Sequence, residues 1–263
     1  MHRQMVDVNG YLTCVLDHQP SVASPDEGRD APMVLVHGTP LDLTAWDDLI
    51  SLLTGRRTVR YDVRGHGAAD ETPVADIATL ADDLIAVLNG LEIGQAHLVG
   101  HSWGGQIVQQ AAIDHTDRVR RLSLLCTRSS PMPAFAGLAA AVRAGQAQPE
   151  DSLERWFSPD ELAQPDPLVA TVTRLLGRAN LDCWAVALDQ IAGFDALARL
   201  RALNLPVDLL AADRDPVATV AHMAQIAAAL PNAALRVLTD AGHLGPLQYP
   251  QVVADVITTN FGD

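Results

Sequence analysis

The sequence predicts an α/β fold in which a mostly parallel central sheet is flanked by helices. Short aliphatic runs alternate with longer amphipathic segments along most of the chain, which is the pattern of successive βα units. Most of these runs consist mainly of aliphatic side chains, as expected for parallel strands that are buried on both faces. A hydrophobic content of 48% in 263 residues is enough for a sizeable core of this kind.

The strands of this sheet are expected at the short aliphatic runs. These are Met33–Val36, Thr58–Tyr61, Ala96–Val99, Leu122–Leu125, Val207–Leu210 and Leu235–Leu238. Helices are expected at the amphipathic segments, near Trp46–Leu53, Ile77–Leu88, Gln106–Asp114, Val220–Leu230 and Val252–Phe261. Before them, Asn9-Gly10 is a strong hairpin signal, which predicts antiparallel edge strands around Met5–Asp7 and Tyr11–Asp17.

One region interrupts this alternation. From about Arg128 to Gly193 no run qualifies as a strand, and prolines at positions 131, 133, 149, 159, 165 and 167 separate short helical pieces. The region is too long for a simple loop in a compact domain. We therefore expect a helical cap at residues 128–193, inserted after the sixth strand and lying over the carboxyl edge of the sheet. The core domain then consists of residues 1–127 and 194–263.

Composition excludes several classes of function. A net charge of −14 and a pI near 4.8 argue against nucleic acid as a partner, because phosphate binding relies on clustered cationic side chains. No apolar stretch approaches the roughly 20 residues that span a bilayer, and residues 1–20 lack the apolar centre of a signal peptide. Cys14, Cys126 and Cys183 are scattered, which argues against disulfides or a zinc site and favours the cytoplasm.

The most informative motif is Gly100-His101-Ser102-Trp103-Gly104-Gly105. It stands between a predicted strand and a predicted helix. Glycines two positions before and two after the serine permit a sharp turn that exposes the hydroxyl at a helix N-terminus. In this context the motif resembles the nucleophile turn of the α/β-hydrolases. Taken alone, it is also consistent with a glycine-rich turn that carries an incidental serine.

In that family the serine is followed along the chain first by an acid and then by a histidine. After Val207–Leu210 the chain reads Ala211-Ala212-Asp213-Arg214-Asp215-Pro216, which resembles the family's acid loop with Ala212 in place of the usual glycine. The resemblance implies that Asp215 is the triad acid, and Asp213 is the alternative. The same segment is also consistent with a solvated acidic turn that has no catalytic role. Gly242-His243 follows the last predicted strand and resembles the family's Gly-His loop, so His243 is the expected base.

The resemblance also implies two backbone donors for an oxyanion, the amides of Trp103 and Thr39. Thr39 lies in the segment His37-Gly38-Thr39-Pro40, in which Pro40 has no N–H to donate. For His37 and His101 we favour a structural role over that of a second base. The segment Asp62-Val63-Arg64-Gly65-His66-Gly67 matches a further motif of the family, and we expect Arg64 and His66 to brace that loop.

These motifs extend in family order over roughly Val34–Leu244, and the chain is identified as a member of the α/β-hydrolases with a small, single cap. A serine at the nucleophile position excludes the haloalkane dehalogenase and epoxide hydrolase patterns, which need aspartate there. The resemblance therefore implies acyl transfer on a small carboxylic ester or lactone. His243 takes the proton of Ser102, an acyl-enzyme forms, and water releases the acid. No metal and no organic cofactor is implied.

Within the family the chain is most similar to 3-oxoadipate enol-lactonases and neighbouring carboxylesterases. The grounds are the segment Arg60–Gly67, the stretch Arg155-Trp156-Phe157-Ser158-Pro159 and the short cap. The chain departs from those lactonases, which usually carry Ser-Met at the nucleophile and lack the His37-Gly38 pair. Ser-Trp-Gly is also similar to proline iminopeptidases, but their cap carboxylates for a substrate amine cannot be located here.

The predicted cap supplies the candidate substrate contacts. Its arginines can either bind a substrate carboxylate or lie on solvated helix faces; they are Arg128, Arg143, Arg155, Arg174 and Arg178. Four aromatic side chains in the cap or at its border are expected mainly to pack the cap, with one or two also lining the site; they are Trp156, Phe157, Trp184 and Phe194. Arg128, Trp156 and Trp184 are the substrate contacts that we expect.

Two other classes occur on the same fold. Cofactor-independent dioxygenases use the histidine as a base in oxygen chemistry, and an acid placed at Asp215 favours hydrolysis over that reaction. Non-catalytic ligand receptors are the second class, and an intact triad argues against it. Activity profiling against esters, lactones and amides discriminates between these classes.

Overall fold

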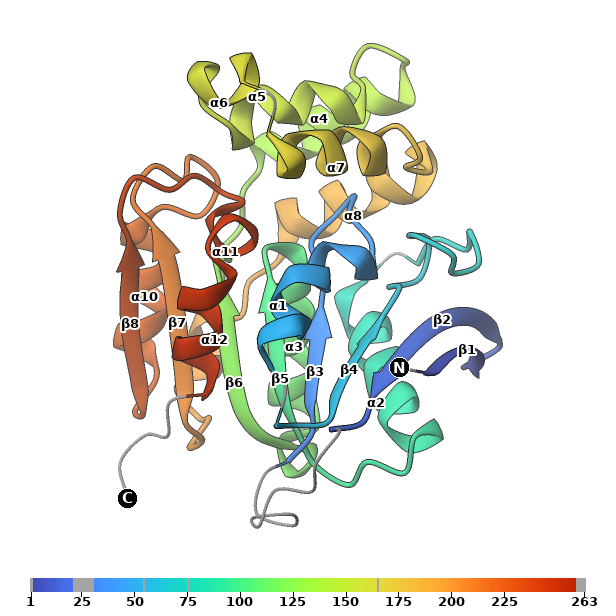
Figure 1. The fold of residues 1–263 in the computed structure, drawn as a ribbon, viewed down its shortest axis with the longest axis vertical. Helices are drawn as coiled ribbons and strands as arrows, with labels where there is room; N and C mark the ends of the chain where they lie inside the picture. The colour runs from blue at the N-terminus through green and yellow to red at the C-terminus, as the bar shows by residue number, and fades with distance from the viewer. Residues whose placement is uncertain (1, 21–30, 54, 75, 165, 259–263) are drawn as a thin grey trace.

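An eight-stranded sheet forms the centre of the protein (Figure 1). The computed structural model describes residues 2–20, 31–53, 55–74, 76–164 and 166–258. The strands are β1 (His2–Val8), β2 (Tyr11–His18), β3 (Met33–Val36), β4 (Thr58–Tyr61), β5 (Ala96–His101), β6 (Val119–Leu125), β7 (Val207–Ala212) and β8 (Ala233–Leu238). Their order across the sheet is β1-β2-β4-β3-β5-β6-β7-β8. All six predicted strands are confirmed, and β5 to β8 are two or three residues longer than predicted.

The first two strands form the predicted hairpin at one side of the sheet. β1 pairs antiparallel with β2, and β2 pairs antiparallel with β4. Asn9 and Gly10 both adopt positive φ at the turn between them, as the Asn-Gly signal requires. From β4 to β8 all neighbouring strands are parallel. Their carboxyl ends therefore lie at one edge of the sheet, which is where ligands bind in open α/β sheets.

Helices cover both faces of this sheet. The α-helices are α1 (Asp47–Leu52), α2 (Ile77–Gly90), α3 (Trp103–Asp114), α4 (Ala134–Arg143), α5 (Leu153–Trp156), α6 (Pro159–Ala163), α7 (Pro167–Leu176), α8 (Leu181–Gly193), α9 (Leu197–Leu200), α10 (Val220–Ala229), α11 (Gly245–Gln248) and α12 (Pro250–Thr258). Short 3₁₀ turns are η1 (Leu43–Trp46), η2 (Thr116–Arg118) and η3 (Pro149–Ser152). Thus the segment predicted as one helix at Trp46–Leu53 is divided between η1 and α1. Residues 259–261 of the last predicted helix lie outside the described residues.

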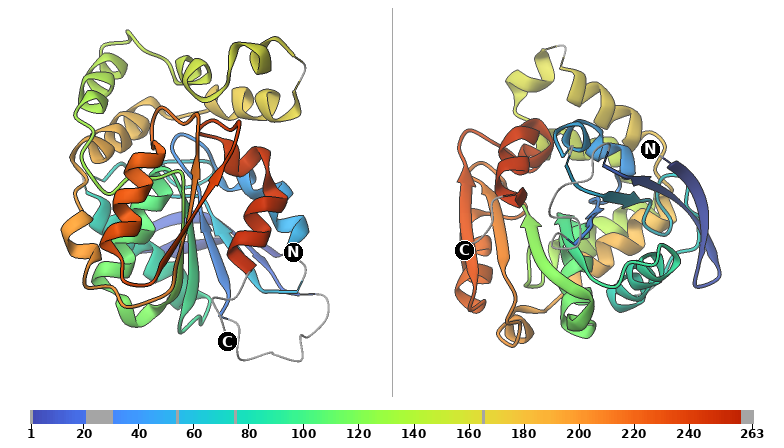
Figure 2. Two further views of the ribbon diagram at one scale, coloured as in Figure 1. Left: turned by 90° about the vertical axis from the view of Figure 1, so that its left-hand side faces the viewer. Right: turned by 60° about the horizontal axis from the view of Figure 1, so that its bottom comes forward.

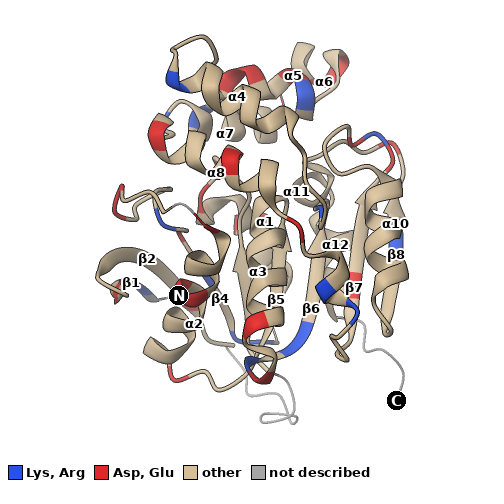
Figure 3. Ribbon diagram, turned by 180° about the vertical axis from the view of Figure 1, so that it is seen from behind, with Lys and Arg blue, Asp and Glu red and all other residues tan. Residues whose placement is uncertain are grey.

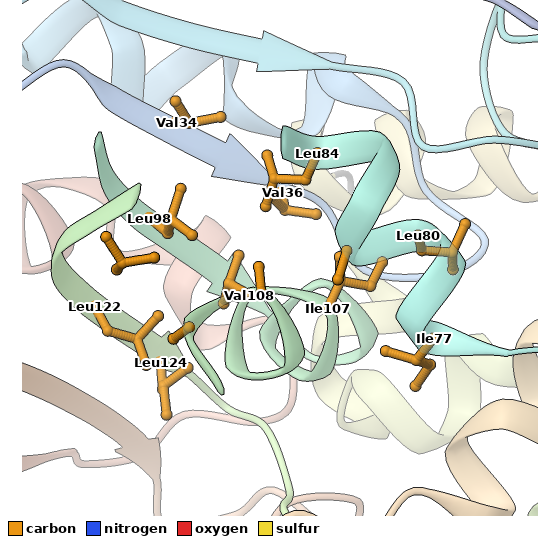
Figure 4. Close-up of a cluster of buried hydrophobic side chains, with 14 of the residues drawn as sticks. Val34, Val36, Ile77, Leu80, Leu84, Leu98, Ile107, Val108, Leu122 and Leu124 are labelled. Carbon is orange, nitrogen blue, oxygen red and sulfur yellow. The ribbon is translucent and has the colours of Figure 1, made fainter. Parts of the chain in front are cut away.

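The core lies in two layers, one on each side of the sheet, because side chains alternate along a strand. In β3, Val34 and Val36 join the cluster that contains Ile107 of α3, whereas Met33 and Leu35 join the other. Figure 4 shows the first cluster, with residues of α2 and α3 against β3, β5 and β6. The left view of Figure 2 shows α10 on one side of the sheet and α1 and α12 on the other. Burial of β3 on both faces explains why its sequence is apolar throughout.

The segment between β6 and β7 is helical in its described residues. Figure 1 shows α4 to α7 above the carboxyl ends of the parallel strands, with α8 beneath them. Ala139 and Val142 of α4 pack against Trp184 and Leu188 of α8 in a small apolar cluster of their own. We infer that residues 128–193 form a cap on a core of residues 1–127 and 194–263.

Charged residues are distributed over both the cap and the body of the protein (Figure 3). Among the helices of the described residues, none combines the length and the apolar character needed to cross a membrane.

Candidate active site

Ser102 occupies a strained turn between β5 and α3. Its backbone φ is 53° and ψ is −120°, a conformation that a residue with a side chain rarely adopts. The turn is tight: a Cβ on Gly100 would lie 2.5 Å from the oxygen of Gly104, and a Cβ on Gly104 would lie 2.3 Å from the oxygen of Val36. Both positions therefore require glycine. Thr127 Oγ1, from the segment that follows β6, donates to the backbone oxygen of Ser102 at 2.6 Å and holds the turn.

Three side chains from separate loops meet in one hydrogen-bonded series. Ser102 Oγ lies 2.8 Å from His243 Nε2, and His243 Nδ1 lies 2.8 Å from Asp215 Oδ2. Asp215 follows β7, and His243 follows β8. The carboxylate can only accept, so Nδ1 carries the proton and donates to Asp215; Nε2 then accepts from the Ser102 hydroxyl. His243 and Asp215 are 2% and 3% exposed, so solvent competes little for these bonds.

Asp215 is held as a carboxylate by the groups around it. Burial alone would raise its pKa, but His243 and the backbone amides of Ala218 and Val217 stabilise the charged form and bring the pKa below its ordinary value. The two amides donate to Oδ1 at 2.9 and 2.7 Å. Asp213 lies elsewhere, accepting from the Ala241 amide at 3.2 Å. The structure thus brings Asp215 to His243 and leaves Asp213 in the adjoining turn.

His101 is tied to the loop that carries His243. Its Nε2–H donates to the His243 backbone oxygen at 3.0 Å, and the two rings lie 5.2 Å apart. Burial, and secondarily the nearby His243, lowers the pKa of His101 to about 3, so its imidazole is neutral at pH 7. The expected structural role of His101 agrees with this geometry, but its sequence position gave no sign of the contact with His243.

The segment after β3 approaches the nucleophile closely. A Cβ on Gly38 would lie 3.1 Å from the Ser102 Cβ, so Gly38 brings the chain against the serine. Thr39 and Trp103, the two expected oxyanion donors, line the same cavity as Ser102. Within the described residues neither of their backbone amides donates a hydrogen bond. Both N–H groups are therefore available to a ligand.

Two buried histidines brace this segment, as expected. The Val63 amide donates to His37 Nε2 at 3.0 Å, so Nδ1 carries the proton and donates to the Gly38 oxygen. His66 Nδ1–H donates to the Arg64 oxygen, and its Nε2 accepts from the Thr39 hydroxyl at 2.7 Å. Burial lowers the pKa of both rings, that of His66 to about 3, so both remain neutral.

Asp62 and Arg64 fix the following loop. Asp62 accepts from the amides of Leu43 and Ala68 at 2.9 and 2.8 Å. Arg64 forms a bidentate pair with Asp83 of α2 at 2.9 and 2.8 Å, and its guanidinium also stacks over the Tyr11 ring at 3.8 Å. These contacts agree with the expected structural role of Arg64.

A cavity with about 510 Å³ of empty volume, part of it open to solvent, lies above Ser102. Arg128, Trp156 and Trp184, the three expected substrate contacts, all line it. The expectation that the aromatic residues mainly pack the cap holds for Phe157 and Phe194, which lie in the hydrophobic core clusters. Trp156 and Trp184 do both, because each also belongs to a core cluster.

The cap arginines separate into three groups. Arg128 and Arg155 line the cavity of Ser102, Arg143 pairs with Asp189, and Arg174 and Arg178 line a second cavity beside the loops at residues 40–44 and 65–71. Arg128 is largely engaged, since its terminal nitrogens donate to the oxygens of Val217 and Pro131. Arg155 Nη2 donates to Ser152 Oγ at 2.8 Å. Burial lowers the pKa of both cavity arginines, so an anion beside either would restabilise the charge.

Several residues that line this cavity were not predicted from the sequence, among them Gln106 and Cys126. Gln106 stands four positions after Ser102, and that helical spacing is a signal that could have identified it. Cys126, directly after β6, adopts a positive φ of 45°. Burial, together with the neighbouring Asp215, raises the pKa of its thiol. Among the described residues, no cluster of three or more His, Cys, Asp or Glu side chains is arranged to hold a metal ion.

The sheet order, the cap position and the Ser102 turn define an α/β-hydrolase. A model of the alpha/beta hydrolase fold family matches residues 31–250, and the chain belongs to that family. It is 30% identical over 217 residues to 3-oxoadipate enol-lactonase 2 of Acinetobacter baylyi, with 80% of each chain covered.

Two solved structures show the same fold over nearly the whole chain. A hydrolase from Pseudomonas aeruginosa PA01 matches with a TM-score of 0.88 and 27% identity, covering 97% of this chain and 96% of that one. The enol-lactonase from Burkholderia xenovorans LB400 matches with a TM-score of 0.87 and 23% identity, covering 97% of this chain and 100% of that one. At 23% identity, the similarity to the Burkholderia xenovorans enol-lactonase shows a shared fold alone.

Proposed function

We propose that this protein is a serine hydrolase that cleaves a small carboxylic ester or lactone through an acyl-enzyme on Ser102. The observation that carries the proposal is the series Ser102 Oγ, His243 and Asp215, with both hydrogen bonds at 2.8 Å. A nucleophile bonded to a base that is itself oriented by a third group is the arrangement that activates a serine.

The chemistry follows from the tautomer of His243. Nε2 accepts the Ser102 proton as Oγ attacks the carbonyl carbon, and Asp215 stabilises the imidazolium that forms. The negative charge moves to the carbonyl oxygen, where the amides of Thr39 and Trp103 donate to it. When the ester bond breaks, Nε2–H returns the proton to the leaving oxygen. Water then attacks the acyl-enzyme by the same route and releases the acid; in a lactone, the leaving hydroxyl stays attached to the acyl chain.

An ester or lactone fits the cavity better than a peptide amine. The lining combines aromatic and aliphatic side chains with Arg128 and Arg155, and none of the described residues that line it is an Asp or Glu that could bind a substrate ammonium. This favours the ester and lactone branch over the iminopeptidase alternative. The relative from Acinetobacter baylyi is named as an enol-lactonase, which supports the same branch. We propose no metal or organic cofactor for this reaction.

Two other classes of protein on this fold, a cofactor-independent dioxygenase and a non-catalytic receptor, are alternative outcomes of the activity test described below. The carboxylate of Asp215 against His243 favours hydrolysis over a cofactor-independent dioxygenase. A serine hydroxyl bonded to an oriented base favours an enzyme over a non-catalytic receptor. The free thiols of Cys14, Cys126 and Cys183 support action in the cytoplasm.

The test is a panel of esters, lactones and amides of graded acyl length, assayed with the native protein and with Ser102→Ala. The proposal predicts ester or lactone hydrolysis, with kcat lower in the variant by a factor on the order of 10⁴–10⁶. Turnover of an ester by Ser102→Ala at the native rate would contradict it. Oxygen-dependent turnover that survives the substitution would indicate the dioxygenase class, and ligand binding without turnover would indicate a receptor.

A further inference from the structure

Gln106 is a buried amide without a hydrogen-bond partner. Its side chain lines the cavity of Ser102, yet the residue is only 2% exposed. Its Oε1 is fully buried and has no partner in the part of the chain that the structure describes. No bond from its Nε2 is present among those residues either. The amide is therefore left unpaired by the described residues, and its oxygen is shielded from water.

The other buried glutamines nearby are bonded at both ends. Gln109 Nε2 donates to the Arg128 oxygen, and its Oε1 accepts from the Ser129 hydroxyl. Gln190 Oε1 accepts from Trp103 Nε1 at 3.0 Å, and its Nε2 donates to the Val74 oxygen at 2.6 Å. Both of these glutamines are thus hydrogen-bonded within the protein through both ends of the amide. Gln106 differs because its amide is unpaired and lines the cavity.

An unpaired buried amide costs folding free energy, which a hydrophobic side chain of the same size would avoid. Its retention is explained if the substrate supplies the missing partner. Gln106 stands four positions after Ser102, the N-cap residue of α3, which is about 6 Å along the helix axis, and both residues line the same cavity. Around it the cap contributes apolar side chains, among them Phe135, Leu138 and Leu188. A few polar groups placed in such a lining fix the orientation and identity of the ligand, and Gln106 is the neutral amide among them.

We propose that Gln106 is a specificity residue of this site and binds a neutral oxygen, keto or hydroxyl, that the substrate carries about one helical turn from the carbonyl attacked by Ser102. The inference rests on the proposed function, because it takes the cavity as the substrate site. A neutral amide both donates and accepts, which matches a keto or hydroxyl oxygen. A carboxylate would instead be bound best by Arg128 or Arg155.

Binding can be measured without turnover in the full chain carrying Ser102→Ala. The probes are methyl hexanoate, its 4-oxo and 5-oxo derivatives, and the monomethyl ester of glutaric acid, titrated by calorimetry. We expect one of the oxo esters to bind about tenfold more tightly than methyl hexanoate, the gain of one additional hydrogen bond. Adding Gln106→Met, which keeps the length but removes the amide, should abolish this preference.

The matched control is Gln110→Met in the same background. Gln110 lies on the same helix, but its amide is already bonded to Asp114 and Arg199, and it does not line the cavity. The control should keep the oxo preference and lower the Tm, whereas Gln106→Met should leave the Tm unchanged or raise it. Equal binding of all neutral esters, no binding of any of them, a preference that survives Gln106→Met, or tightest binding of the glutarate monoester overturns the proposal. Failure of the proposed function has a separate sign, the absence of hydrolysis by the protein with Ser102 intact.

Discussion

The imidazole of His101 donates to the backbone oxygen of His243 at 3.0 Å, linking two residues 142 positions apart. His101 directly precedes the nucleophile, and His243 is the residue whose Nε2 meets the nucleophile's hydroxyl. The bond therefore fixes the loop after β8 against the end of β5. His101 is a positioning residue in this arrangement, because it acts through His243 rather than on the substrate.

His101→Leu removes this bond, and we expect kcat to fall by about 10²-fold with little change in KM, since small displacements of a reacting group cost that much. His101→Gln retains an N–H near the position of Nε2 and should recover most of kcat. Steady-state kinetics of both variants measures this difference. The control is His97→Leu, also on β5, where a buried imidazole bonds Ser123 Oγ at 2.8 Å away from the cavity. Equal loss of kcat in His97→Leu, or no rescue by glutamine, would contradict the positioning role.

Asp215→Asn should lower kcat by roughly 10⁴, because the amide no longer selects the His243 tautomer that accepts the serine proton. Asp213→Asn should cost far less, since Asp213 contacts the Ala241 amide and not His243. The measurement is kcat for both variants on the best ester of the panel. The reverse order of effects would mean that the acid is Asp213.

Substitution of Arg155 tests whether the substrate is anionic. A protein with a net charge of −14 repels anions at a distance, so an anionic substrate needs a local cation in the cavity. If the enol-lactonase likeness extends to function, Arg155→Met should raise KM for carboxylate-bearing esters by about tenfold or more and leave neutral esters unchanged. Arg143→Met is the control, because Arg143 pairs with Asp189 and does not line the cavity. If neutral esters are hydrolysed as well as anionic ones, and Arg155→Met affects both alike, the enol-lactonase likeness does not extend to function. The protein would then be a carboxylesterase without preference for an anionic substrate.

Stability should rise with pH in acid. Burial lowers the pKa of His66, His97 and His101 from 6.5 to about 3. Between these values the unfolded chain binds protons that the folded chain does not, so protonation favours unfolding as the pH falls. Each such histidine contributes a slope of up to about 1.4 kcal/mol per pH unit. The free energy of unfolding, measured with urea at several values between pH 4 and 7, should therefore rise less steeply with pH for His97→Gln than for the native protein. An identical slope, or greater stability at lower pH, would contradict this assignment.

The positions of the strands and the parallel character of the sheet could be predicted because burial on both faces leaves a continuous apolar run, as in β3. The residues of the Ser102 series could be predicted because each directly follows a strand in a short motif. Helix boundaries were less accurate: α3 begins at Trp103 rather than Gln106, because the glycine pair hides the first turn from a hydrophobic pattern.

Contacts between distant loops could not be predicted from the sequence. Asp213 and Asp215 lie two residues apart in one loop, so spacing in the sequence does not tell which of them contacts His243. The folded loop directs Asp215 to His243. The bond from His101 to the His243 oxygen depends on the packing of two loops that no local pattern relates. The same holds for Arg155, whose access to the cavity is set by the paths of the cap helices.

Covalent reaction of Ser102 with the help of His243 is tested by intact-protein mass spectrometry after treatment with a fluorophosphonate, followed by peptide mapping of the adduct. We predict one adduct per chain, located on Ser102, absent in Ser102→Ala and formed far more slowly in His243→Ala. An adduct on another residue, or equal labelling of the native protein and Ser102→Ala, would contradict the account.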